Sequence, residues 1–395
     1  MRSDLTPGPW LRLAALGAAA ATLTAVVSGT IGPGTAHSLL SALAVPPLVA
    51  LAVAGRVAYP RLLAPAVAAL AFFGAAAAIT APGVHATLAA LAFAAALVTC
   101  VQAFRGAPAS SGPWRDYVTL TKPRIMSLLL VTGAAGVFVG AQGVPDGTVF
   151  AAAMVGLALA CGGASALNHV LDRDLDRLMG KRTERRPVAA GRVPPERALE
   201  FGLVLSALSF VLLASAVNVL TAALALVGNL FYVLVYTRWL KRSTPQNIVI
   251  GGAAGAVPPL VGYAAATGTL ALPALWLFLI VFLWTPPHFW ALALLIKENY
   301  AAARVPMLPV VRGEDETTRQ ILLYTVVLVA FSTWVGLWLG PVYTVTSVLL
   351  GLGFLWIARQ LRRDPTRRRA AVLFHYSLAY LAVLFVAAAL DPMLL

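Results

Sequence analysis

Long apolar runs alternate with short polar segments along the whole chain of 395 residues. Runs of about 18 or more apolar residues are typical of membrane-spanning helices, because lipid forces every backbone polar group to be bonded within its own segment. The pattern therefore predicts an all-α, polytopic membrane protein. Thirteen helices are expected, at residues 11–29, 38–54, 62–80, 84–102, 125–143, 149–168, 199–217, 219–237, 247–266, 272–294, 320–339, 343–360 and 371–390.

A stretch rich in Gly, Pro and Ser at residues 104–117 reads as a linker that divides the chain. Four alanine-rich helices precede it, and nine helices follow it. Two long polar loops follow the second and the sixth of these nine. The sequence therefore predicts two domains, a four-helix membrane bundle over residues 1–110 and a nine-helix domain over residues 111–395. The first apolar run is too long for the hydrophobic region of a signal peptide, so we interpret it as the first helix.

The charges lie almost entirely in short loops between the expected spans. Hydrophobic residues make up 60% of the chain and charged residues 11%, with a net charge of +14. The Lys- and Arg-rich segments fall on alternate sides of successive helices, so all of them face one side, which the positive-inside rule identifies as the cytoplasm. This pattern favours an inner (plasma) membrane protein with a cytoplasmic N-terminus and an outer C-terminus, and it gives little support to a nucleic-acid-binding class.

The loop after the sixth expected span carries a candidate metal site. Asn168, Asp172 and Asp176 are spaced i, i+4 and i+8, so their side chains share one helical face over two turns. Like charges at this spacing repel each other, and a divalent cation would offset the repulsion. Mg²⁺ is the natural candidate because it takes carboxylate and carbonyl oxygens and shares its remaining positions with water and substrate phosphates. Asp174 is expected to point away from this face.

Clustered cations beside these acids indicate a diphosphate site. Lys122 and Arg124 flank Pro123 at the expected first turn of a helix, where an anion is favoured. For any single arginine of the loop, an ordinary positive-inside charge is an equal reading. The cations of the loop are Arg173, Arg177, Lys181, Arg182, Arg185 and Arg186.

A second polar loop follows the span at residues 272–294. Pro286 and Pro287 are expected to interrupt that span beside His288, and broken helices in membranes tend to line cavities. His288 is therefore a candidate substrate contact, although a plainly packed histidine is an equal reading. Three residues that emerge on the same side as the acidic loop complete the expected site: Lys297, Glu298 and Tyr300.

Three motifs carry a family resemblance over about residues 115–395. "ASALNHVLDRDLDRLMGKRTERRPVAAGRV", "YTRWLKRSTPQNIVIGGAAGAVPPLVGY" and "HFWALALLIKENYAAARVPMLPVVRG" resemble the protohaem IX farnesyltransferases, or haem O synthases, of the intramembrane prenyltransferase superfamily. The resemblance implies nine helices around a central cavity, with Mg²⁺ and farnesyl diphosphate at its cytoplasmic mouth. Asn168, Asp172 and Asp176 match the family's first metal motif. Asn299 and Arg304 stand where the wider pattern has an acid and a glycine.

The implied reaction transfers a farnesyl group from farnesyl diphosphate to a vinyl group of haem b, with water adding to the same vinyl, to make haem O. Two alternatives remain open: a prenyltransferase acting on a quinone precursor or chlorophyllide, and a secondary transporter, which would place ionisable residues near the centres of its spans. The expected catalytic residues are Asn168, Asp172, Asp176 and Lys297. The expected substrate-binding residues are Lys122, Arg124, Arg182, Arg186, Glu298, Tyr300 and His288.

The N-terminal helices carry two of the five histidines of the chain, His37 and His85. Both open alternate helices, so we expect them at the same outer face, where two imidazoles across a four-helix bundle could supply axial haem ligands. Residues 11–103 also weakly resemble half of haem A synthase, the enzyme that uses haem O, which makes that enzyme a candidate partner. Histidines that simply lie at the wet membrane boundary are an equal reading.

Overall fold

Helices account for all regular secondary structure in residues 7–31, 37, 41–78, 82–105 and 113–394, the part of the chain that the computed structural model describes. The all-α prediction is confirmed. The N-terminal helices are α1 (Pro9–Ile31), α3 (Val45–Val57), α4 (Pro60–Ala78) and α5 (Pro82–Arg105). The long helices that follow are α7 (Pro123–Ala141), α8 (Gly147–Leu171), α11 (Pro195–Ala216), α12 (Val219–Leu230), which continues as the π-helix η1 (Phe231–Leu240), α14 (Asn247–Thr267), α15 (Leu272–Leu295), α18 (Gly313–Leu339), α19 (Pro341–Arg363) and α20 (Arg367–Leu394).

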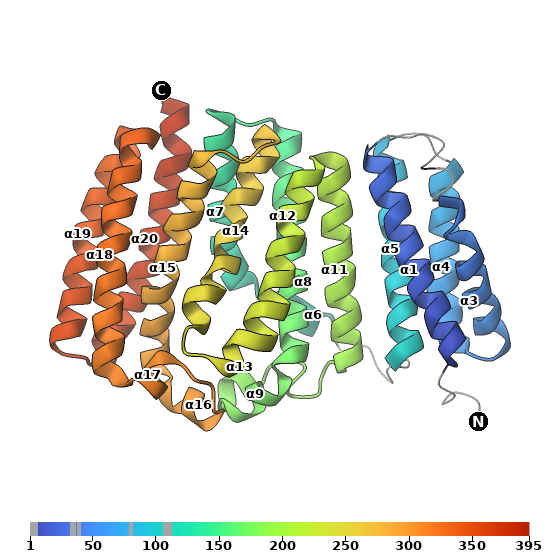
Figure 1. Ribbon diagram of the computed structural model, residues 1–395, viewed down its shortest axis with the longest axis horizontal. Helices are drawn as coiled ribbons and strands as arrows, with labels where there is room; N and C mark the ends of the chain where they lie inside the picture. Colours follow the sequence, from blue (N-terminus) through green and yellow to red (C-terminus); the bar gives the residue numbers. More distant parts are fainter. Residues whose placement is uncertain (1–6, 32–36, 38–40, 79–81, 106–112, 395) are drawn as a thin grey trace.

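The long helices run roughly parallel to one another, so the connecting segments gather at two ends of the molecule (Figure 1). Ten described helices are long and apolar enough to cross a membrane, and nine of them lie after residue 113, as predicted for the core. Three N-terminal helices are shorter apolar segments, so the total of thirteen spans stays a prediction. Short helices lie at the lower end in Figure 1, which we call the loop side: α6 (Trp114–Leu120), α9 (Arg173–Leu178), α10 (Lys181–Glu184), α13 (Lys241–Ser243), α16 (Lys297–Ala302) and α17 (Leu308–Val311).

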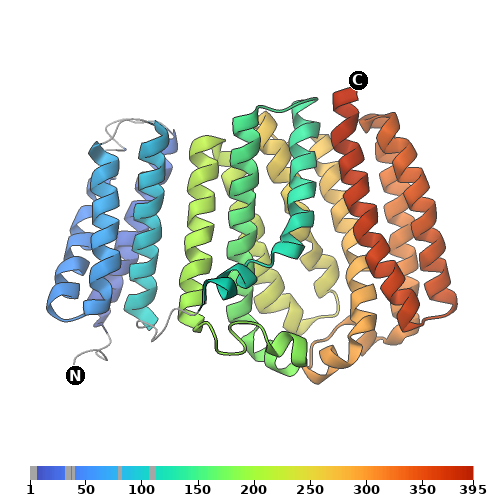
Figure 2. The same ribbon diagram turned by 180° about the vertical axis from the view of Figure 1, so that it is seen from behind.

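The four N-terminal helices form a bundle beside α11, at one edge of the nine-helix core (Figures 1 and 2). Val26 of α1 and Phe93 of α5 share a buried cluster with Ala207 and Val211 of α11. Apolar side chains of mixed size fill this contact, in which Ala90 and Ala207 lie among valines and phenylalanines. Residues 106–112, where the predicted domain boundary lies, are outside the described residues, so the boundary stays a prediction.

Glycines set the spacing of the helices that carry the polar site. A Cβ atom on Gly136 of α7 would overlap the backbone of Pro259 in α14, and one on Gly163 of α8 would overlap the Ser206 side chain and the Gly202 backbone of α11. Such contacts bring helix backbones together and hold them in a fixed register. They therefore position the loop-side ends of α7 and α8, where the polar site lies.

The expected interruption of a span at Pro286 and Pro287 is wrong. Both prolines lie inside α15, which runs without a break from Leu272 to Leu295. They are buried, and Thr285 Oγ1 donates a hydrogen bond of 2.8 Å to the Val281 carbonyl oxygen in the same region. Membrane helices tolerate proline where neighbouring helices pack around it and side chains bond to the freed backbone groups. The rule that proline interrupts a helix considers the local sequence alone and leaves this packing out.

Candidate functional site

The acidic motif lies where α8 ends, on the loop side. Asp172 separates α8 from α9, but the helical hydrogen bonds continue through it: the Asp172 N–H donates to the Asn168 carbonyl oxygen, and the Asp176 N–H to that of Asp172, both at 2.8 Å. Asn168, Asp172 and Asp176 thus follow one another at single-turn intervals, as their spacing predicted. Asn168 is 3% exposed, and both aspartates are fully buried.

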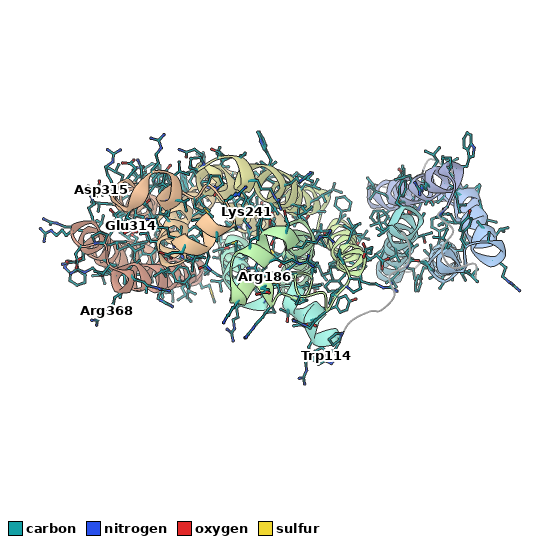
Figure 3. The ribbon with its side chains drawn as sticks, turned by 90° about the horizontal axis from the view of Figure 1, so that it is seen from below. Trp114, Arg186, Lys241, Glu314, Asp315 and Arg368 are labelled. Carbon is teal, nitrogen blue, oxygen red and sulfur yellow. The ribbon has the colours of Figure 1, made fainter. Side chains whose placement is uncertain are left out.

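Each of the three side chains is held by a cation from another part of the chain. Lys241 Nζ lies 2.5 Å from Asp172 Oδ2, and Arg186 Nη1 lies 2.6 Å from Asp176 Oδ1. Lys122 Nζ donates a hydrogen bond of 2.8 Å to Asn168 Oδ1. Arg186 and Lys241 are marked on the loop side in Figure 3. The structure therefore joins the residue before α7, the end of α8, α9, the loop after α10 and the start of α13 in one buried polar cluster, which we call the acidic cluster.

The π-helix η1 and the short helix α13 after it contribute two residues that the sequence did not single out, Thr237 and Lys241. Asn168 Nδ2 donates to Thr237 Oγ1 at 3.0 Å as well as to Asp172 Oδ2 at 2.8 Å, and Lys241 follows η1 directly. Short π-helical segments are frequent at functional sites because they shift side chains relative to the preceding α-helix. In the sequence, Lys241 looked like an ordinary positive-inside residue, and its pairing with an acid 69 residues away has no local signal.

Lys122 adopts a conformation that is rare for its residue type. Its φ of 50° and ψ of 60° lie in the left-handed region, directly before Pro123. Non-glycine residues visit this region seldom, and those that do tend to be held at functional sites by their surroundings. Here the bond to Asn168 supplies such a constraint. Burial, and then the positive charge of Arg186, lower the pKa of Lys122 to about 7.

Asp174 points away from the acidic cluster, as predicted. Its carboxylate accepts two hydrogen bonds of 2.7 Å from the Arg242 guanidinium and remains largely exposed. These hydrogen bonds lower the pKa of Asp174 to about 2. The motif thus contains two buried carboxylates and one exposed carboxylate of the same residue type.

The second polar loop packs against the first. Asn299 Nδ2 of α16 donates a hydrogen bond of 2.7 Å to the Met179 carbonyl oxygen, just after α9. Tyr300 is buried in the same apolar cluster as Leu175 and Met179, and burial raises the pKa of Tyr300 to about 12. Asn299 thus fastens the two loops together at a position where the family pattern led us to expect an acid. Arg304 has a φ of 53°, a conformation that favours the glycine expected there.

The remaining predicted site residues lie elsewhere on the loop side. Lys297 Nζ lies 3.0 Å from Glu314 Oε1 at the start of α18, so this ion pair is outside the acidic cluster. Arg124 and Glu298 are exposed. The side chain of Arg182 is outside the described residues. A role in substrate binding stays a prediction for each of these four.

The predicted histidines occupy two different environments. His288 is buried between Trp284, at a centroid distance of 4.3 Å, and Phe374, at 4.7 Å, and its Nδ1 lies 2.7 Å from Ser377 Oγ. These contacts account for His288 as a packed residue, and its role as a substrate contact stays a prediction. His37 Nδ1 lies 3.0 Å from Ser28 Oγ. The side chain of His85 is outside the described residues.

The acidic cluster has free acceptor oxygens that fit a divalent cation. Asp172 Oδ1 and Asp176 Oδ2 are buried and have no hydrogen-bond partner among the described residues. Among the described residues, no group of three or more His, Cys, Asp or Glu side chains could hold a metal ion. The acidic cluster instead offers two carboxylates and one amide. Such an incomplete set suits Mg²⁺, which keeps water and substrate phosphates in its remaining positions.

The comparison of sequences gives one family for most of the chain. The sequence model of the UbiA prenyltransferase family matches residues 129–384. "Protoheme IX farnesyltransferase" of Symbiobacterium thermophilum is 55% identical over 282 residues, which cover 70% of this chain and 94% of the relative. The protein of the same name from Marinobacter nauticus is 50% identical over 285 residues, covering 72% and 94%. That from Roseiflexus castenholzii is 50% identical over 279 residues, covering 70% of this chain but 52% of the relative.

Solved structures share the fold at low sequence identity. A digeranylgeranylglyceryl phosphate synthase is similar with a TM-score of 0.60 and 18% identity, covering 71% of this chain and 99% of that one. A UbiA homologue from Archaeoglobus fulgidus, solved with GPP and Mg²⁺, has a TM-score of 0.54 and 18% identity, covering 67% and 99%. At this identity the likeness concerns the helical architecture alone.

Proposed function

Because the chain belongs to the UbiA prenyltransferase family, we propose that it is a protohaem IX farnesyltransferase. It transfers the farnesyl group of farnesyl diphosphate to a vinyl group of haem b and makes haem O. The observation that carries this proposal is the acidic cluster, in which two buried carboxylates each have an oxygen without a hydrogen-bond partner among the described residues and three cations stand within hydrogen-bond distance of the motif. The relatives at about 50% identity support the same substrates.

The difficult step is the departure of diphosphate from the farnesyl C1 atom. The C1–O bond breaks, its electron pair leaves with the diphosphate, and an allylic cation remains. Mg²⁺ supplies charge neutralisation for the leaving group when it is bound, and Asn168, Asp172 and Asp176 would hold it. Lys122, Arg186 and Lys241 donate hydrogen bonds to the diphosphate oxygens after a side-chain rotation away from their present partners.

The allylic cation needs a dry and electron-rich surface. Tyr232 and Tyr236 stack on each other on η1 with a centroid distance of 5.5 Å, and Tyr236 immediately precedes Thr237. Aromatic faces of this kind stabilise a neighbouring cation. The farnesyl C1 atom then bonds to the terminal vinyl carbon of haem b. The positive charge passes to the inner vinyl carbon, where water adds and releases a proton.

The test of this function uses haem composition as its readout. Cells that express the full chain and make haem b should accumulate the hydroxyethylfarnesyl haem, detected by mass spectrometry of extracted haems. Purified protein should release pyrophosphate from farnesyl diphosphate only when haem b and Mg²⁺ are both present. Release that instead depends on a quinone precursor or chlorophyllide would replace the proposed acceptor, and no release with any acceptor would contradict a prenyltransferase.

We also propose an orientation in the plasma membrane. The loop side carries the acidic cluster and the Lys- and Arg-rich loops, so the positive-inside rule puts it in the cytoplasm. α1 begins on this side and α20 ends on the opposite side (Figure 1). A reporter enzyme that is active only outside the cytoplasm should therefore work when fused after Leu395.

For the N-terminal bundle we propose haem binding by His37 and His85, and haem A synthase as a partner that takes up the product. The support is that α1 ends and α5 begins at the upper end in Figure 1, because His37 follows α1 in the sequence and His85 belongs to the first turn of α5. The full chain with added haem should give a low-spin bis-imidazole spectrum that is lost in both His37→Ala and His85→Ala. A spectrum that survives both substitutions would rule out this pair of ligands.

A further inference from the structure

A second basic site lies on the loop side, next to the acidic cluster. It is a cavity of about 650 Å³ lined by Arg177, Lys181, Glu184, Arg185, Ala189, Ala190 and Arg192. Asp176 and Arg186 are paired in the acidic cluster, whereas their neighbours in the sequence, Arg177 and Arg185, are exposed and line this cavity. The arginines that the sequence grouped into one diphosphate site are therefore divided between two sites.

Hydrogen bonds hold the walls of this cavity in place. Arg177 Nε donates to the Ala189 carbonyl oxygen at 2.9 Å. Arg192 Nε and Nη2 donate to the two carboxylate oxygens of Asp116, at 2.8 and 3.0 Å, and Nη2 also donates to the Arg185 carbonyl oxygen at 3.0 Å. A guanidinium group anchored along one edge keeps its other N–H groups available in a fixed direction.

The charge of the lining is positive. Asp116 neutralises Arg192, which leaves three cations, Arg177, Lys181 and Arg185, against the single carboxylate of Glu184. The side chains of Lys181 and Arg185 make no hydrogen bond or ion pair with other described residues. Exposed cations that converge on one cavity without carboxylate partners are suited to an anion with several oxygen atoms.

The cavity borders the segment that runs along the membrane boundary. Asp116, which anchors Arg192, belongs to α6. Trp114, at the start of α6, is 69% exposed and projects away from the core, with the Arg115 guanidinium 5.6 Å from its ring centre (Figure 3). Tryptophan and arginine side chains exposed in this way are typical of the level of lipid headgroups. The wall of the cavity is thus tied to a helix at the lipid surface.

We propose that this cavity is a second anion site, separate from the acidic cluster, which binds a phosphate group. Planar guanidinium groups fit phosphate oxygens in pairs, and basic pockets beside membrane helices bind anionic headgroups. The phosphate can come from an anionic phospholipid next to α6 or from free diphosphate near the mouth of the acidic cluster. The proposal does not rest on the farnesyl-transfer activity.

The acetylation rate of Lys181 reports on occupancy of the cavity directly. The full chain is placed in nanodiscs of phosphatidylcholine, without haem or farnesyl diphosphate and with EDTA, and modification of the Lys181 peptide is followed by mass spectrometry. In separate samples, phosphatidylglycerol is added to the bilayer or inorganic diphosphate to the buffer. Occupancy of the site should slow acetylation of Lys181 about fivefold or more, because the amine is held against phosphate oxygens.

Two variants separate this site from general charge effects. Arg185→Ala removes one cation of the lining, and the protection of Lys181 should fall to less than half. Arg368→Ala removes an exposed cation at the start of α20, on the loop side but far in Figure 3 from Arg186, the sequence neighbour of Arg185, and protection should be unchanged. Arg185→Glu serves as a second variant, with complete loss of protection expected.

The pattern across the samples identifies the source of the phosphate. Protection by phosphatidylglycerol alone assigns a lipid headgroup, protection by diphosphate alone assigns a free anion, and protection by both means that the two compete for one site. Protection by neither, or equal protection in the protein with Arg185→Ala, overturns the proposal. Because no farnesyl acceptor is present, this result does not depend on whether haem O is made.

Discussion

Asp172→Asn is the sharpest test of the metal role of the acidic cluster. Asp172 is fully buried, and its Oδ2 atom accepts hydrogen bonds from Lys241 at 2.5 Å and from Asn168 at 2.8 Å. An asparagine in the same rotamer can keep its amide oxygen at that position and put its NH₂ group at the place of Oδ1, which has no hydrogen-bond partner among the described residues and lies 3.9 Å from Arg242 Nη2. The substitution therefore removes the charge but preserves the shape and both hydrogen bonds.

The expected costs to folding and to catalysis differ in size. Hydrogen bonds to charged groups contribute about 1.5–3 kcal/mol and neutral ones about 1 kcal/mol, so the fold should lose about 1–2 kcal/mol. Complete removal of one partner of a buried ion pair would cost about 3–5 kcal/mol. Loss of a group that stabilises developing charge raises the barrier by about 3–4 kcal/mol, which slows the reaction by about 100- to 1,000-fold.

The assay compares haem O formed per folded enzyme in three proteins, with gel filtration to confirm folding. Asp172→Asn and Asp176→Asn should each lose at least about 99% of turnover. Asp174→Asn is the matched control, because Asp174 is an exposed aspartate whose hydrogen bonds go to Arg242, a residue 3.9 Å from Asp172 Oδ1, and to none of Lys122, Arg186 and Lys241; it should stay within about threefold of the unchanged protein. Near-normal turnover by Asp172→Asn, or an equal loss in all three, would refute the assignment.

Removal of divalent metal with EDTA should stop pyrophosphate release, and Mg²⁺ should restore it; release that continues in EDTA would contradict a metal role. Lys122→Ala should raise the KM for farnesyl diphosphate about tenfold, and Lys297→Ala should raise it less because Lys297 pairs with Glu314. An unchanged KM removes the residue from the diphosphate clamp. Arg304→Gly should raise the free energy of unfolding by about 1 kcal/mol because it relieves a left-handed φ, whereas Ala301→Gly within α16 should lower it; equal unfolding midpoints would refute this.

The membrane class and the metal-binding face could be predicted because both depend on local properties. Whether a segment of about 20 residues partitions into lipid follows from its own composition, and the nine core spans were found in this way. The shared face of Asn168, Asp172 and Asp176 follows from helical geometry over eight residues. The opposite direction of Asp174 follows from the same geometry.

Wrong or incomplete predictions arose where a local rule met tertiary packing. Pro286 and Pro287 break isolated helices, yet α15 continues through them because neighbouring helices surround that turn. His288 stays a predicted substrate contact, and its stacking on Phe374 became visible only once α15 and α20 were packed together. A polar residue in a span indicates that it needs a partner but does not identify that partner.

The sequence by itself determined the spans, the loops and the position of the acids along them, because lipid solvation and helical hydrogen bonding act over a few turns. Only the tertiary structure decided which cation meets which side chain of the motif. Lys241 reaches Asp172 across 69 residues and Lys122 reaches Asn168 across 46, and close contacts between helices set both distances. Neighbouring arginines 185 and 186 have the same charge in the sequence, but the fold of their loop directs one to a buried carboxylate and the other to an open cavity.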